Sequence, residues 1–123
     1  MPEELIKVSE LVLDRDAPLP ILSVLYNKKY PVIVDITATV STGFVVGQSI
    51  TGDDDESNNF IIFNNINYFL GKTIWLKIVI WHPTIKNYDF NIKIKQGDKI
   101  IFELNKAGVF EGFTYMYEGV IFK

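Results

Sequence analysis

The sequence contains no cysteine among its 123 residues. Disulfides, thiolate metal sites and thiol nucleophiles are therefore excluded. Histidine is almost absent as well, since His82 stands alone between a tryptophan and a proline at the start of a turn. A hydrolytic triad needs a base held beside a nucleophile, and a single turn histidine is more typical of a structural residue. Because no phosphate-binding motif occurs either, these absences predict a protein that is not an enzyme.

Long apolar runs and clusters of basic residues are also missing. No stretch of about 18 uncharged apolar residues is present, so no membrane-spanning helix is expected. The N-terminal residues MPEELIKVSEL lack the basic and apolar regions of a signal peptide, which predicts a soluble protein in the cytoplasm or on a particle. The net charge is −3 and Arg15 is the only arginine beside eleven lysines. Nucleic-acid surfaces usually carry a basic stripe with arginines, so nucleic-acid binding is not expected.

Alternation of apolar and polar side chains is the dominant pattern, and it predicts strands with one buried side. In YDFNIKIK, residues 88–95, every second side chain is apolar, and VIVDITATV, residues 32–40, repeats the pattern. TIWLKIVIW, residues 73–81, is apolar on both sides apart from Lys77. Such a strand is expected to be covered on both sides or to lie at an interface.

Turn sequences rich in Asp, Asn, Gly and Pro separate the predicted strands, and QGDK offers a glycine for a tight hairpin. PEELIKVSELVL fits a short N-terminal helix or an extended arm, and its apolar and β-branched residues favour a strand. Short strands without a long helix predict one all-β domain over residues 1–123, an antiparallel β-sandwich that is jelly-roll-like or similar. Eight or nine strands are expected, at about residues 5–13, 21–26, 32–40, 44–47, 60–70 (in one or two pieces), 73–81, 88–95, 99–104 and 113–122.

Four consecutive acids, Asp53, Asp54, Asp55 and Glu56, are candidates for a weak calcium site, because calcium takes six to eight oxygen ligands. The spacing does not match an EF-hand, since Asn58 stands at the glycine position and Asn64 at the position of the bidentate glutamate. A sandwich would also need acids from adjacent loops. A solvated loop that separates two strands is the simpler interpretation.

Aromatic residues make up 14% of the chain and many lie late in the sequence. In FTYMYEGVIF, residues 113–122, one side carries Phe113, Tyr115, Tyr117 and Ile121. The aromatic residues are either core or a contact surface, because interface centres are enriched in Tyr, Trp, Phe and Met. The candidate contact residues, for a protein partner or for a stacked sugar ring, are Trp75, Trp81, Tyr115 and Tyr117.

Two functions compete on these grounds, and an enzyme is held as a third class only because carboxylate pairs that meet in space are not visible in a sequence. The favoured one is a non-enzymatic structural or interaction module that forms a homo-oligomer or docks onto a larger assembly. The alternative is a ligand-binding β-sandwich that binds carbohydrate or, with calcium, resembles C2 domains. In general character the chain is similar to small all-β assembly modules such as phage fibre heads, capsid decoration proteins and tail-associated sandwiches. That likeness rests on size, strand content, the absence of cysteine and an N-terminal arm, and on no motif.

Overall fold

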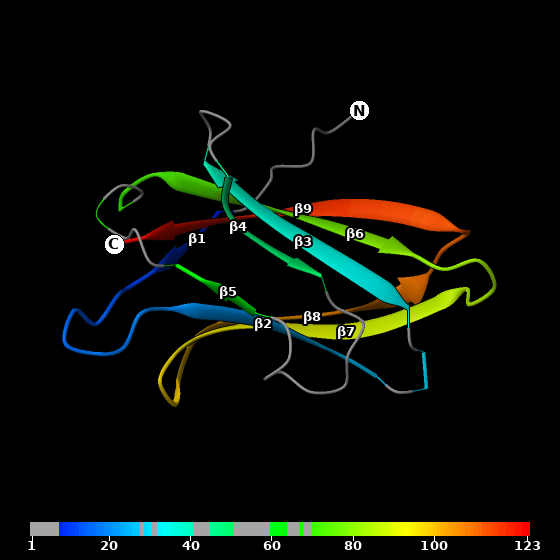
Figure 1. The fold of residues 1–123 in the computed structure, drawn as a ribbon, viewed down its shortest axis with the longest axis horizontal. Helices are drawn as coiled ribbons and strands as arrows, with labels where there is room; N and C mark the ends of the chain where they lie inside the picture. Colours follow the sequence, from blue (N-terminus) through cyan, green and yellow to red (C-terminus); the bar gives the residue numbers. More distant parts are fainter. Residues whose placement is uncertain are drawn as a thin grey trace.

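A computed structural model describes residues 8–27, 29–30, 32–40, 45–50, 60–63, 67 and 70–123, without the side chains of 45–50, 60 and 61. The elements that these residues form are strands (Figure 1). Their bounds are β1 Val8–Leu11, β2 Ile21–Tyr26, β3 Ile33–Val40, β4 Val45–Ile50, β5 Phe60–Ile62, β6 Thr73–Trp81, β7 Asn87–Gln96, β8 Lys99–Val109 and β9 Phe113–Phe122. The all-β class predicted from the alternation is confirmed.

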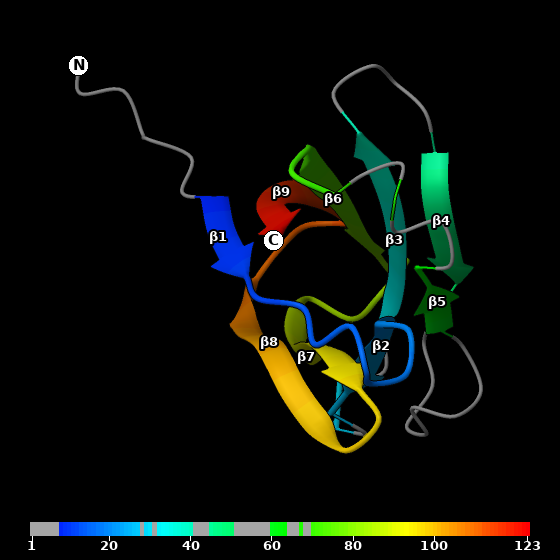
Figure 2. The ribbon, with the colours of Figure 1, turned by 90° about the vertical axis from the view of Figure 1, so that its left-hand side faces the viewer.

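The strands form two sheets. The five-stranded sheet has the order β1-β9-β6-β3-β4, and the four-stranded sheet has the order β5-β2-β7-β8. Figure 2 shows the sheets as two layers, with β1 and β8 on one flank and β4 and β5 on the other. Neighbouring strands pair antiparallel except β1, which runs parallel to β9. The sequence predicted an entirely antiparallel sandwich, and the parallel pairing of β1 with β9 shows that this part of the prediction was wrong.

The inward side chains of both sheets form one hydrophobic core. Alternate residues of β3 and β7 are buried, as their sequence patterns predicted, and β6 contributes Ile74, Leu76, Ile78 and Ile80 with no exposed surface. The layers also meet through rings, since Phe63 packs edge-on against Phe122 with 5.2 Å between their centroids. Because successive side chains of a strand point to opposite sides, the side chains between these core residues form the outer surfaces of the two sheets.

Several strand bounds differ from the expected ones. β8 continues to Val109, through the NKAG sequence that was expected to interrupt it, and β4 continues to Ile50. The extra part of β8 pairs with the first half of β7, as in Asn87 opposite Val109. Pairing with a long neighbour therefore overrides the turn-like composition of this segment.

The structure also tests the predictions for the N-terminal segment, for the glycine turn in QGDK and for residues 60–70. Residues 8–11 of the ambiguous first segment form β1, a strand that ends two residues earlier than expected, while residues 1–7 lie outside the described part. Gly97 has a φ of 60° in the turn between β7 and β8, as QGDK predicted. The expected segment 60–70 contains β5, a strand of only three residues, among its described residues.

Candidate functional site

The outer surface of the five-stranded sheet carries most of the predicted contact residues. β6 and β9 pair antiparallel along their whole lengths, and residues directly opposite each other in such a pair point to the same side of the sheet. The outward pairs, in order along the two strands, are Trp81 with Phe113, Val79 with Tyr115, Lys77 with Tyr117, and Trp75 with Gly119. The long register therefore brings side chains from two distant segments into one surface.

Four of these aromatic side chains are strongly exposed, and we call them the aromatic face. The exposed fractions are 41% for Trp81, 58% for Phe113, 57% for Tyr115 and 46% for Tyr117. Phe113 was not predicted as a contact residue, although the alternation of β9 places it on the same side as the two tyrosines. Other exposed large apolar residues belong to different strands and loops.

The rings of the aromatic face are inclined to one another. The centroids of Phe113 and Tyr115 are 6.1 Å apart and their planes make an angle of 57°. Tyr115 and Tyr117 are 5.9 Å apart with an angle of 80°. Edge-to-face packing stabilises such rings against each other. It produces a ridged surface rather than a flat one.

Trp75 lies on the same side of the sheet but is partly covered. The space for its indole ring exists because the opposite residue is Gly119, where an added Cβ would lie 2.8 Å from Cζ3 of Trp75 and 3.1 Å from Cγ2 of Val8. Trp75 is thus packed against the backbone of β9. It borders the aromatic face and is less available for a partner than the other three predicted residues.

Two charged residues accompany the aromatic face. Lys77 is exposed, and its Nζ lies 6.0 Å from the ring centroid of Tyr115, within the range of a cation–π contact. Asp35 of β3 lies opposite Val79, and its Oδ1 is buried without a hydrogen-bond partner. Buried carboxylate oxygens without partners are rare in folded proteins.

The outer surface of the four-stranded sheet has a different character. Asn27 donates a hydrogen bond to Asp89, 3.0 Å away, and Asn91 donates to Glu103 and Asn105 at 2.9 and 2.7 Å. These polar groups bond to one another across the sheet, while Oδ1 of Asn91 is buried without a hydrogen-bond partner. The two outer surfaces therefore differ: the four-stranded sheet mixes polar groups with separate exposed aliphatic residues, whereas the five-stranded sheet carries a row of aromatic side chains.

The predicted calcium site cannot be placed in the fold. Asp53, Asp54, Asp55 and Glu56 all lie outside the described residues. Within the described part of the chain, no group of three or more His, Asp or Glu side chains comes close enough to hold a metal ion. The same part contains no helix with the length and apolar character needed to cross a membrane.

His82 has a local structural role. Its Nδ1 accepts hydrogen bonds from the backbone N–H groups of Thr84 and Ile85, at 3.1 and 2.9 Å. The imidazole therefore organises the turn that joins β6 to β7. Side chains that bond to backbone groups two and three residues later are characteristic of turns.

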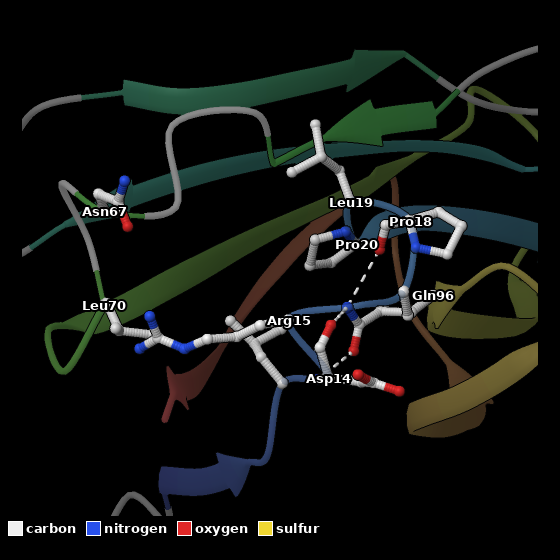
Figure 3. A pocket seen from close by; sticks show the side chains of 10 residues that line it. Asp14, Arg15, Pro18, Leu19, Pro20, Asn67, Leu70 and Gln96 are labelled. Atoms are coloured by element: carbon white, nitrogen blue, oxygen red, sulfur yellow. Dashed lines mark hydrogen bonds between the residues drawn. The ribbon is translucent and has the colours of Figure 1, made fainter.

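A small cavity lies beside the loop that joins β1 to β2 (Figure 3). Its volume is about 200 Å³, below the range of about 300–1,000 Å³ typical of ligand pockets. Gln96, one of the polar side chains that line it, donates to the carbonyls of Asp14 and Pro18 and accepts from the N–H of Asp14. Both N–H groups of the amide are used by the loop, so Gln96 has no donor left for a ligand.

Comparison with known protein families, with curated proteins and with solved structures finds no match for this chain.

Proposed function

We propose that this chain is a non-enzymatic interaction module that self-assembles, or docks onto a larger assembly, through its aromatic face. The observation that carries the proposal is the contiguous row of four exposed aromatic side chains on β6 and β9. With about 150–250 Å² for each side chain, their exposed parts amount to about 400 Å². A patch of that size on a small protein is often functional.

The proposal includes a finer description of the fold and its setting. We infer that the two sheets form a β-sandwich, jelly-roll-like or of similar connectivity, because their inward side chains belong to one core cluster. Such a module would act in the cytoplasm or on a particle. Its partner would be a protein rather than nucleic acid or a membrane, since the outer surface of β3, β6 and β9 carries one lysine and no arginine around the aromatic face.

The ring geometry favours a protein partner over a carbohydrate. A sugar ring stacks flat on an aromatic ring, so a chain of sugars needs aromatic rings that share one plane. Successive rings along β9 are inclined by 57° and 80° and do not provide such a platform. A ridged aromatic surface suits side chains that interdigitate, as they do at protein–protein interfaces.

Light scattering of the wild-type protein tests the proposal. We expect the mass to rise above that of the 14.1 kDa chain between about 10 μM and about 1 mM, a range that covers weak and moderate affinities. The double variant Trp81→Ser, Tyr115→Ser is expected to stay monomeric over this range. Both substitutions remove apolar surface from the contact without touching the buried core.

The matched control changes exposed apolar residues on the other sheet. Ile62 and Val109 are 43% and 75% exposed on the outer surface of the four-stranded sheet, so Ile62→Ser, Val109→Ser is expected to associate like the wild type. If the wild type is monomeric throughout, the self-assembly proposal is wrong. If the aromatic variant and the control behave alike, the contact lies elsewhere.

A further inference from the structure

We infer that the partner of the aromatic face is a second copy of this chain, related by a two-fold axis, with Lys77 of each copy paired to Asp35 of the other. This inference rests on the proposed function, because it names the partner of the same face. Three features support it: the charges on the face, their placement and the apolar area.

The outward surface of β3, β6 and β9 carries one cation and one anion, Lys77 and Asp35, and its other described side chains are uncharged. Neither residue has an ion-pair partner among the described residues. The carboxylate of Asp35 is partly withdrawn from water, and its Oδ1 receives no hydrogen bond. A cation brought close by a partner would offset that loss of hydration.

The positions of the two charges suit a symmetric contact. Asp35 lies opposite Val79, and Thr37 lies opposite Lys77, so the two charged residues are diagonal neighbours on adjacent strands. A two-fold interface uses the same surface on both subunits, and each contact therefore occurs twice with the roles exchanged. If the two-fold axis lies in the plane of the interface and passes midway between Lys77 and Asp35, at right angles to the line that joins them, Lys77 of one copy lies over Asp35 of the other. Within one chain, Lys77 instead extends over the ring of Tyr115.

The apolar area fits the centre of such a contact. Standard interfaces bury about 800 Å² on each partner, so the exposed aromatic area of about 400 Å² would supply half of it. Interface centres are rich in aromatic residues and poor in charges, as this surface is. Two ion pairs beside an aromatic centre would then fix the orientation of the two copies.

Charge reversal in two separate chains tests the pairing. Lys77→Asp places only acids in the contact of a symmetric dimer, and Asp35→Lys places only lysines there. Each variant is expected to self-associate at least about tenfold more weakly than the wild type. In an equimolar mixture, both ion pairs are restored between unlike chains, so a heterodimer is expected. Native mass spectrometry with one chain isotopically labelled distinguishes the heterodimer from either homodimer.

The controls separate this inference from the proposed function. Lys99→Asp and Asp98→Lys make the same charge changes where the turn after β7 meets the start of β8, and each should associate like the wild type. If Trp81→Ser, Tyr115→Ser abolishes association but Lys77→Asp leaves it intact, the two-fold pairing is wrong and the proposed function stands. A wild-type protein that stays monomeric overturns this inference together with the self-assembly part of the proposed function.

Folding of the variants is checked by circular dichroism. If either single reversal fails to fold, the exchange Lys77→Asp, Asp35→Lys in one chain replaces it. This exchanged chain is expected to form a homodimer and to form no heterodimer with the wild type, because that mixture would oppose like charges. Equal association with itself and with the wild type would contradict the pairing.

Discussion

Gln96 shows how a single buried polar residue holds an irregular segment in place. It is only 4% exposed, and its amide forms three hydrogen bonds to the backbone of Asp14 and Pro18. Those backbone groups belong to the loop between β1 and β2, which backbone–backbone hydrogen bonds tie to residues beside the sheets only at its two ends, by Leu13 N–H to Lys123 and by Phe63 N–H to Pro20, among the described residues. The amide therefore replaces the hydrogen bonds that a neighbouring strand would supply.

Removing this amide should destabilise the protein measurably. Gln96→Ala leaves partly buried backbone groups of Asp14 and Pro18 without partners, which costs about 2–3 kcal/mol of unfolding free energy. Urea denaturation followed by circular dichroism measures the change. Asn87→Ala, an exposed amide on the same strand, is the control and should cost about 0.5 kcal/mol or less. Equal effects of the two substitutions would show that the hydrogen bonds of Gln96 contribute little.

The sequence pattern indicates that the side chain of Gln96 points inward. In residues 88–95 the even positions are the apolar, inward ones, and the same alternation extended by one residue points Gln96 inward. A polar side chain at an inward position needs hydrogen-bond partners. Its partners could not be predicted, because Asp14 and Pro18 are about 80 residues away in the chain.

At the level of strands, the pairing of β6 with β9 depends on a close contact between Trp75 and Gly119. The indole ring occupies the space that a side chain at position 119 would fill. A glycine within a strand usually marks such a close approach. This contact explains why Trp75, unlike Trp81 on the same strand, is partly covered.

Gly119→Ala is expected to lower the unfolding free energy by about 1–3 kcal/mol, because the new methyl group would lie too close to the Trp75 ring. Chemical denaturation measures the loss. In a Trp75→Val background the ring is absent, so the same glycine substitution should cost clearly less, and the double-mutant cycle isolates the contact. A cost that is equal in both backgrounds would place the strain elsewhere.

Strand prediction succeeded where one side of a strand is apolar and the other polar, as in β3 and β7. For β6 the predicted bounds 73–81 agree with the structure, but the side that faces the core stayed open, because both sides are apolar and alternation cannot distinguish them. The last part of β8 was not predicted as a strand, because its sequence starts with polar residues on both sides. Its polar residues Asn105 and Lys106 resemble a turn, but they are held by β7 and by an ion pair from Lys106 to Glu118 at 3.5 Å. Long-range partners of this kind are not visible in a local sequence pattern.

For the whole molecule, the decisive feature is the difference between its two outer surfaces. Trp81, Tyr115 and Tyr117 were predicted as contact residues from composition and alternation, and the register of β6 with β9 places all three on one exposed surface. The sequence could not show that Asp35 would lie beside them, since strand order depends on the packing of the entire chain. The predicted acids at 53–56 lie outside the described residues and remain a prediction.

Self-association through the aromatic face has a consequence for the stability of the whole protein. A partner that binds only the folded state stabilises it by mass action, by about 2.7 kcal/mol when its concentration is 100 times Kd. The thermal midpoint of the wild type is therefore expected to rise with protein concentration. The midpoint of the double variant Trp81→Ser, Tyr115→Ser should change little over the same range, because it stays monomeric, and the midpoint of Lys77→Asp should rise less than that of the wild type, because it associates more weakly. Circular dichroism melts at several concentrations measure this, and a wild-type midpoint that does not depend on concentration would contradict self-association of the folded protein over that range.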